Sequence, residues 1–218
     1  MAKHIFTYIN PPSERDLDAA CLVLEQGGVI AYPTDVNWSI GCDASNVKAV
    51  DRLRAIKPAK NIEVDKQPFS LIFSSLSMAA NYATVDGHHY RLLKKSLPGP
   101  YTFILKRSKN LARQINDKRR IVGIRIPQSP LILALVDKFA RPLATTSLSF
   151  PLDSEMNYLK FGFEIEERFG HGIDLILDLG EEVIYRETSI IDLSSDEPQI
   201  VRSGVGDISM FQLIQNES

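Results

Sequence analysis

The chain has 218 residues, of which 44% are hydrophobic and 24% charged, a size and balance typical of one globular domain with its own core. No apolar run is long enough to cross a membrane, and the amino-terminal residues lack the apolar stretch of a signal peptide. The two cysteines, Cys21 and Cys42, stand among apolar residues and favour a reduced protein. We therefore expect a single cytoplasmic domain over residues 1–218 that does not enter a membrane.

The chain opens with weak strand alternation over residues 3–9. Ser13 is then a suitable N-cap for a helix through residue 25, which Gly27-Gly28 would end. The apolar run 29–32 before Pro33 predicts a buried strand.

Later strands are predicted from short apolar runs, at residues 38–42, 69–73, 101–106, 121–126, 143–146, 174–179, 189–193 and 200–202. Helices are predicted from apolar residues at helical spacing, at residues 47–56, 74–82, 87–96, 130–139, 163–168 and 208–214. Residues 57–67 are polar and aperiodic and predict a loop. Strands and helices mix without a strict βαβ repeat, which favours an α/β (α+β) fold with a twisted mixed β-sheet flanked by helices.

The net charge of −2 hides an uneven distribution of charge. Residues 94–125 hold ten basic residues and one acid, Asp117, whereas residues 151–187 hold ten acids and three basic residues. This sorting is compatible with a positive binding surface, and equally with two solvated faces of opposite sign.

Several common site motifs are absent from the sequence. It contains no GxxxxGK[ST] loop, and Gly204-Val205-Gly206 does not extend to a dinucleotide-binding fingerprint. The four histidines are scattered, and none pairs with a cysteine at metal-ligand spacing. There is no GxSxG elbow and no other evident nucleophile. The remaining possibility is chemistry by binding, orientation and electrostatics.

Four segments place hydroxyls, turn residues or a guanidinium at the ends of predicted strands. They are residues 32–35 (YPTD), 98–103 (PGPYTF), 123–127 (GIRIP) and 145–149 (TTSLS). Strand ends line the ligand crevices of open α/β sheets. Arg125 there would clamp a phosphate or a carboxylate with its planar fork.

These segments, in this order, resemble the YrdC/YciO family of threonylcarbamoyl-adenylate synthases and their paralogues. The resemblance runs from about residue 27 to about residue 206 and includes GGVIAYPTD, LPGPYTFIL, IRIPQSP, RPLATTS and the late ETSIIDL. It implies a YrdC-like open sheet with a concave basic cleft. It also implies a synthase that uses ATP, L-threonine and bicarbonate, with Mg²⁺ bound to the ATP and no permanent cofactor, to make threonylcarbamoyl-AMP and pyrophosphate for tRNA modification. Some members of the family are described as binding tRNA or double-stranded RNA.

Carried over position by position, the resemblance makes Lys57 and Arg125 the catalytic residues. It assigns the other nucleotide and substrate contacts to Thr34, Thr102, Thr146, Ser147, Ser149, Ser189 and Arg202. It implies no metal ligands in the protein itself.

The sequence departs from the synthase pattern at two paired motifs. The family's Lys-x-Arg is here Lys57-Pro58-Ala59, and its Ser-x-Asn is Ser147-Leu148-Ser149. Residues 36–39 (VNWS) also differ from the threonine, tyrosine and glycine of synthases. These departures resemble the YciO branch, and loss of one oriented phosphate contact typically lowers a rate about a hundredfold.

Several candidate residues also have a structural alternative, and for Ser147 and Ser149 it is hydrogen bonding to a neighbouring loop. Thr34 suits a turn, Lys57 suits the C-terminal end of a helix, and Arg125 suits a pair with a structural carboxylate. Trp38 suits the core as well as a base-stacking platform. For the whole chain, the alternatives to a synthase are an RNA-binding module without catalysis and an interaction protein with an inert pocket.

Overall fold

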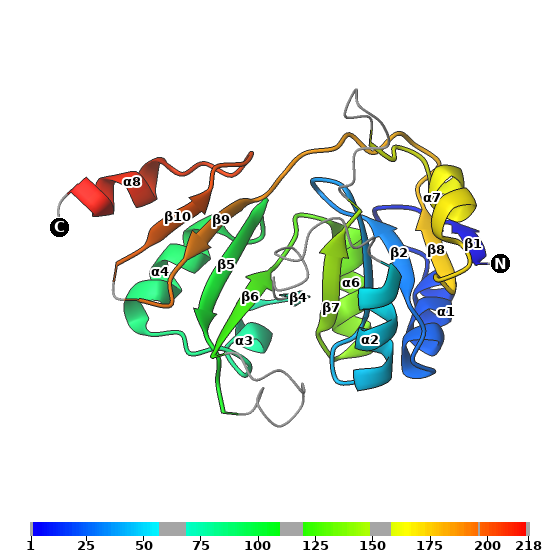
Figure 1. Ribbon diagram of the computed structural model, residues 1–218, viewed down its shortest axis with the longest axis horizontal. Helices are drawn as coiled ribbons and strands as arrows, with labels where there is room; N and C mark the ends of the chain where they lie inside the picture. Colours follow the sequence, from blue (N-terminus) through cyan, green and yellow to red (C-terminus); the bar gives the residue numbers. More distant parts are fainter. Residues whose placement is uncertain (1, 57–68, 110–119, 149–157, 196, 217–218) are drawn as a thin grey trace.

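The structure, a computed structural model, describes residues 2–56, 69–109, 120–148, 158–195 and 197–216 (Figure 1). Ten strands of this part form one sheet. They are β1 (Lys3–Phe6), β2 (Ile30–Pro33), β3 (Trp38–Asp43), β4 (Ser70–Ile72), β5 (Tyr101–Lys106), β6 (Ile121–Arg125), β7 (Leu143–Ser147), β8 (Leu175–Asp178), β9 (Ser189–Asp192) and β10 (Gln199–Arg202). The described helices are α1 (Glu14–Glu25), α2 (Val47–Ile56), α3 (Leu76–Ala79), α4 (Gly87–Ser96), α6 (Pro130–Phe139), α7 (Gly162–Phe169) and α8 (Ser209–Asn216).

The sheet is mixed, and its strand order is β1-β8-β2-β3-β7-β4-β6-β5-β9-β10. The pairs β1·β8, β2·β8, β4·β6 and β5·β9 are parallel, and the other neighbouring pairs are antiparallel. The prediction of a twisted mixed sheet with flanking helices is therefore confirmed.

The sheet buries its two faces unequally. One face forms a continuous core with residues of α2, α4, α7 and α8. The other face packs against α1 and α6, but its core includes strand residues of β2, β4, β7 and β8 only. In Figure 1, α2 stands in front of the sheet and α4 behind it, although both cover the same face, because the sheet twists strongly around β4.

This arrangement leaves one half of the second face open within the described residues. On β5, Phe103 and Leu105 are buried towards the core, whereas Ile104 is partly exposed and Lys106 is exposed. On β9, Ile191 is buried while its neighbours in the strand, Ile190 and Asp192, are partly exposed. Alternating side chains point to opposite faces of a strand, so the second face is accessible over parts of β5, β9 and β10, whereas Gly123 and Arg125 of β6 are buried on it.

Most element boundaries match the sequence-based expectation. Asn46 caps α2 by accepting a hydrogen bond from the backbone N–H of Ala49, at 3.1 Å. Gly27 ends α1 with a φ of +78°. Two predicted ends are wrong: the first strand stops at Phe6, where its partner β8 also ends, and the third helix stops at Ala79.

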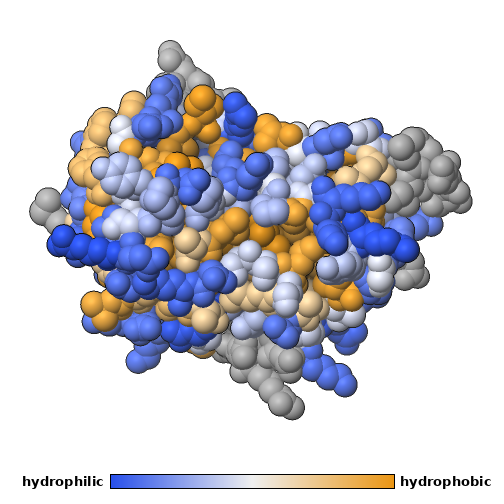
Figure 2. Space-filling model, turned by 180° about the vertical axis from the view of Figure 1, so that it is seen from behind, coloured by the Kyte–Doolittle hydropathy of each residue, from blue (hydrophilic) through white to orange (hydrophobic). Residues whose placement is uncertain are grey.

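The early end of α3 coincides with a contact to a distant part of the chain. Ala83 forms an antiparallel bridge with Arg107, just beyond β5, so the chain leaves the helix to pair there. In the described part of the chain, none of the helices is both long and apolar enough to span a bilayer. The space-filling view mixes hydrophobic and hydrophilic residues over the visible face, as is usual for protein surfaces (Figure 2).

Candidate functional site

Arg125, the last residue of β6, lies at the centre of the candidate site. Arg125 is only 5% exposed, and its Nη2 lies 3.5 Å from Oδ1 of Asp35. Burial lowers the pKa of Arg125 and the charge of Asp35 opposes this effect, but a guanidinium stays charged at neutral pH. The Nε and Nη2 of Arg125 and the Oδ1 of Asp35 are buried without a hydrogen-bond partner among the described residues. Such orphaned groups are rare in folded proteins and call for a partner.

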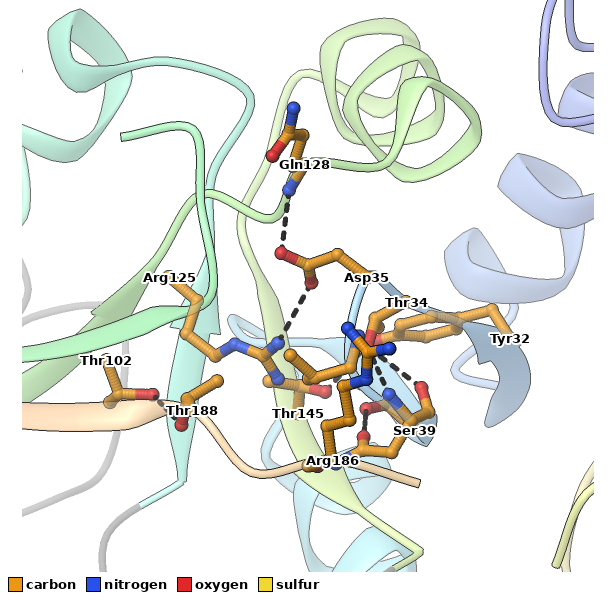
Figure 3. A network of polar contacts seen from close by, with 12 residues as sticks. Tyr32, Thr34, Asp35, Ser39, Thr102, Arg125, Gln128, Thr145, Arg186 and Thr188 are labelled. Carbon is orange, nitrogen blue, oxygen red and sulfur yellow. Dashed lines mark hydrogen bonds and ion pairs between the residues drawn. The ribbon is translucent and has the colours of Figure 1, made fainter. Parts of the chain in front are cut away.

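The second carboxylate oxygen of Asp35 fixes the position of its side chain. Its Oδ2 accepts a hydrogen bond of 3.1 Å from the backbone N–H of Gln128, which precedes α6 (Figure 3). The β2–β3 turn is thereby fixed to the start of α6, and Oδ1 is left facing Arg125.

Thr34 closes the same turn. Its Oγ1 donates to the carbonyl of Asn37 at 2.8 Å and accepts from the backbone N–H of Asn37 at 3.2 Å. The turn role considered for Thr34 is therefore present in the structure, and its contact with a ligand stays a prediction.

A pair of buried hydroxyls lies on the same sheet face as Arg125. Thr145 Oγ1 donates to the carbonyl of Ile40 at 3.1 Å, so the hydroxyl of Tyr32 is the donor to Thr145 Oγ1 at 2.8 Å. Burial raises the pKa of Tyr32 well above its ordinary value, which keeps the phenol neutral. The register places Thr145 and Gly123 on either side of Ser70, so the side chain of Arg125, two residues along β6, points to this face.

A second polar group lies on the open half of this face. Thr102 Oγ1 is 3.1 Å from Thr188 Oγ1, and Thr188 in turn accepts a hydrogen bond from Arg202 Nη2 at 2.9 Å. Arg202 also pairs with Glu187, at 3.2 Å between Nη1 and Oε1. The positive charge of Arg202 is close enough to lower the pKa of Arg125 further. Thr102, Arg125 and Arg202 are thus brought together.

Two predicted residues point elsewhere. Ser189 is fully buried, and its Oγ donates to the carbonyl of Gly206 at 2.7 Å and accepts from the N–H of Gly204 at 3.0 Å, so it holds the glycine turn before α8. Thr146 pairs with Ile40 and points to the opposite face from its neighbour Ser147.

The remaining predicted residues are only partly placed. Ser147 pairs with Ser39 on the face that carries Thr145. Lys57 and Ser149 lie outside the described residues. The described residues contain no cluster of three His, Cys, Asp or Glu that could hold a metal ion.

Five polar residues of this network were given no individual role from the sequence, namely Tyr32, Asp35, Asn37, Thr145 and Thr188. Tyr32, Asp35 and Thr145 nevertheless lie in the segments that were singled out. Asp35 stood within the YPTD segment, and the available signal was a carboxylate directly after a buried strand. Asn37 was noted only as a departure from the synthase pattern, whereas its Nδ2 donates to the carbonyl of Arg186 at 3.0 Å. Trp38, the next departure, is a core residue whose Nε1 donates to the carbonyl of Lys160 at 2.9 Å.

Comparison with known proteins places this site in a family. The model of the Sua5, YciO and YrdC proteins, described as telomere recombination, matches residues 22–204. The chain belongs to the Sua5/YciO/YrdC family.

Three members of the Sua5/YciO/YrdC family illustrate the range of similarity. YciO of Escherichia coli K12, an uncharacterized protein, is 36% identical over 209 residues, which cover 94% of this chain and 98% of YciO. The crystal structure of E. coli YciO has a TM-score of 0.85 and 33% identity and covers 97% of this chain and 100% of that one. Threonylcarbamoyl-AMP synthase of Vibrio vulnificus YJ016 is 26% identical over 193 residues, which cover 87% of this chain and 98% of the synthase.

Sua5 of P. abyssi is the third member, and its structure contains a ligand. P. abyssi Sua5, crystallised in complex with L-threonine, has a TM-score of 0.80 at 24% identity and covers 98% of this chain and 60% of that one. At this identity the likeness shows a shared fold. By sequence identity, E. coli YciO at 36% is more similar to this chain than the Vibrio synthase at 26%.

Proposed function

We propose that this protein binds L-threonine and ATP–Mg²⁺ in the pocket around Arg125, and that it forms threonylcarbamoyl-AMP slowly. The observation that carries the proposal is the buried Arg125–Asp35 pair with its orphaned atoms. Buried donors beside a buried acceptor suit a ligand that presents an anion and a donor side by side. The carboxylate and ammonium groups of an α-amino acid have this arrangement.

The proposed reaction needs no nucleophile from the protein. Bicarbonate supplies carbon dioxide and leaves hydroxide. The threonine nitrogen, as the neutral amine, adds to the carbon of carbon dioxide to form a carbamate, and the proton that it loses joins the hydroxide as water. A carbamate oxygen then bonds to the α-phosphorus of ATP as the bond from that phosphorus to the pyrophosphate oxygen breaks. The protein has to hold the reactants in line and neutralise phosphate charge. In this scheme Arg125 holds the carboxylate of threonine, while Lys57, Ser147 and Arg202 contribute to phosphate binding.

The low rate follows from Ala59 and Ser149. Where the family pattern has an arginine and an asparagine, these side chains offer no guanidinium and no amide. Each missing transition-state contact costs a factor on the order of 10² in rate. Thr146 and Ser189 have no part in the proposed chemistry, because one points to the other face and the other is bonded to the glycine turn.

A pyrophosphate-release assay tests the catalytic half of the proposal. It compares the unchanged chain with Ala59→Arg/Ser149→Asn, in the presence of ATP, Mg²⁺, L-threonine and bicarbonate. We expect slow, threonine-dependent release from the unchanged chain and faster release from the double variant. Release that does not depend on threonine, or none from either protein, would contradict synthase activity.

RNA binding without catalysis is a second candidate function. Its support is that basic side chains of the 94–125 block are exposed, namely Lys94, Lys95, Lys106, Lys109 and Arg120. Affinity of this kind for tRNA or duplex RNA falls steeply with salt, since phosphate contacts release counterions. A gel shift that is absent, or that does not weaken between low and high salt, would remove this candidate.

A further inference from the structure

The connection from β8 to β9 runs beside the β2–β3 turn (Figure 1) and brings a further arginine, Arg186, next to the polar network of the candidate site (Figure 3). The backbone N–H of Arg186 donates to the carbonyl of Val36 at 2.6 Å. The carbonyl of Arg186 accepts from Nδ2 of Asn37 at 3.0 Å. Both polar groups of its backbone are thus bonded to residues directly after Asp35.

The position of Arg186 is fixed from two further directions. Asn37 is 5% exposed, and its Oδ1 accepts a hydrogen bond of 3.2 Å from Ser39, so the side chain that holds Arg186 is itself held. On the other side, the ring of Tyr185 stacks on that of Tyr158, with the centroids 3.7 Å apart. The backbone of Arg186 is therefore fixed beside the β2–β3 turn by hydrogen bonds and packing, and not by its own side chain.

The side chain of Arg186 lies beside the polar network. Figure 3 shows it extending from the β8–β9 connection along the β2–β3 turn that holds Thr34. It is exposed, and its guanidinium has no hydrogen bond or ion pair with the described residues. The nearby Arg202 differs, since its guanidinium is already bonded to Thr188 and Glu187.

The two available arginines have different surroundings. Arg125 is buried beside the acceptor Asp35, which suits a zwitterion. Arg186 is exposed beside the β2–β3 turn, and no acid among the described residues pairs with it. The neighbouring carboxylate of Glu187 is bonded to Arg202 and to the hydroxyl of Tyr185. An unpaired, solvated guanidinium suits a strongly hydrated polyanion, and its planar fork matches phosphate oxygens.

We infer that Arg186 is a phosphate-binding residue of this pocket, positioned by Asn37, and that it holds the phosphates of the nucleotide while Arg125 holds the amino acid. This inference rests on the proposed function. It adds Arg186 to the phosphate contacts proposed for Lys57, Ser147 and Arg202, so Arg186 and Arg125 should each control the affinity for a different ligand.

Calorimetric titrations of ATP–Mg²⁺ and of L-threonine into four proteins test this inference. They are the unchanged chain, Arg186→Gln, Arg186→Lys and Arg168→Gln, where Arg168 is an exposed arginine of α7 that serves as a control for net charge. We expect Arg186→Gln to weaken ATP binding about tenfold or more, since hydrogen bonds to charged groups are the stronger ones. Arg186→Lys should fall between Arg186→Gln and the unchanged chain, and all variants should bind L-threonine as the unchanged chain does.

The outcomes separate the inference from the proposed function. If the unchanged chain binds both ligands and Arg186→Gln binds ATP equally well, the role of Arg186 is refuted and the proposed function stands. The role is also refuted if Arg168→Gln loses as much affinity as Arg186→Gln. If the unchanged chain does not bind ATP, the role of Arg186 and the proposed function are both refuted. Asn37→Ala, checked for folding by circular dichroism, should weaken ATP binding in the same direction, because it releases the carbonyl of Arg186.

Discussion

The Nη2 of Arg125 lies 3.5 Å from the Oδ1 of Asp35, too far for a good hydrogen bond although both groups are buried. Asp35 has a second anchor in the backbone N–H of Gln128. Arg125 leaves its Nε and Nη2 without hydrogen bonds to described residues. The pair is therefore a costly arrangement in the unliganded protein, of the kind that is maintained at binding sites.

Substitutions of Asp35 and of Arg125 should differ in how much they lower the free energy of unfolding. Asp35→Asn leaves a buried guanidinium that cannot lose its charge, at a cost of about 3–5 kcal/mol in the free energy of unfolding. Arg125→Met should cost less, because the remaining carboxyl can take up a proton and keeps its bond to Gln128. Urea unfolding of both variants at pH 7 measures the difference. A larger loss in Arg125→Met would contradict this account of the pair.

Gly41 is required beneath the ring of Tyr32. A Cβ at this position would lie 2.6 Å from the hydroxyl of Tyr32 and 3.0 Å from the carbonyl of Ala144. Gly41→Ala should therefore destabilise the protein by roughly 1–3 kcal/mol. Adding Tyr32→Phe should recover part of this loss, because it removes the closest atom.

Gly87 provides the matched control for Gly41. A Cβ at Gly87 would meet nothing within 4 Å, so Gly87→Ala should leave the unfolding midpoint nearly unchanged. Thermal unfolding of the three variants and of the unchanged chain checks both statements. Equal losses in Gly41→Ala and Gly87→Ala would show that the crowding at Tyr32 is unimportant.

His4 joins the edge strand β1 to α7 and β8. Its Nδ1 lies 3.1 Å from Oε2 of Glu166, and its Nε2 lies 2.8 Å from Oδ2 of Asp178. Burial by itself lowers the pKa of His4, but the hydrogen bonds to the two carboxylates outweigh it and raise the pKa above 6.5. A group whose pKa is raised on folding stabilises the protein fully below its unfolded pKa, and this stabilisation is lost as the pH rises through the folded pKa.

His4→Gln should therefore destabilise the protein most at pH 5.5, and the difference from the unchanged chain should shrink towards pH 9. We expect a difference in melting temperature of roughly 2–4 °C at the lower pH. His171→Gln, at an exposed histidine, is the control. A difference that grows with pH would have the wrong sign for this mechanism.

Local sequence signals predicted the elements well because they depend on neighbouring residues. Helices α2, α4 and α6 have the expected bounds, since their apolar spacing and capping residues lie within the segment. The ends that differ, at Phe6 and Ala79, are set by strand partners distant in the sequence, β8 and the residues after β5. Pairings of this kind leave no mark in the local pattern.

The site was predicted less completely than the fold. Arg125 was singled out because it places a guanidinium at the end of a predicted strand, and it does lie at the end of β6, buried beside Asp35. The residues that complete the site depend on tertiary contacts. Asn37 acts on the backbone of Arg186, 149 residues away, and Thr188 acquires its neighbours only when β9 joins β5.

The central claim is that Arg125 and Asp35 form the receiving site for a small zwitterionic ligand. The most direct measurement is a calorimetric titration of L-threonine, with ATP–Mg²⁺ present, into the unchanged chain and into Arg125→Met of confirmed folding. We predict binding to the unchanged chain and an affinity at least about a hundredfold lower in Arg125→Met, since a charge-assisted bidentate contact is lost. Equal binding by the two proteins, or no heat from the unchanged chain at millimolar threonine, would contradict the claim.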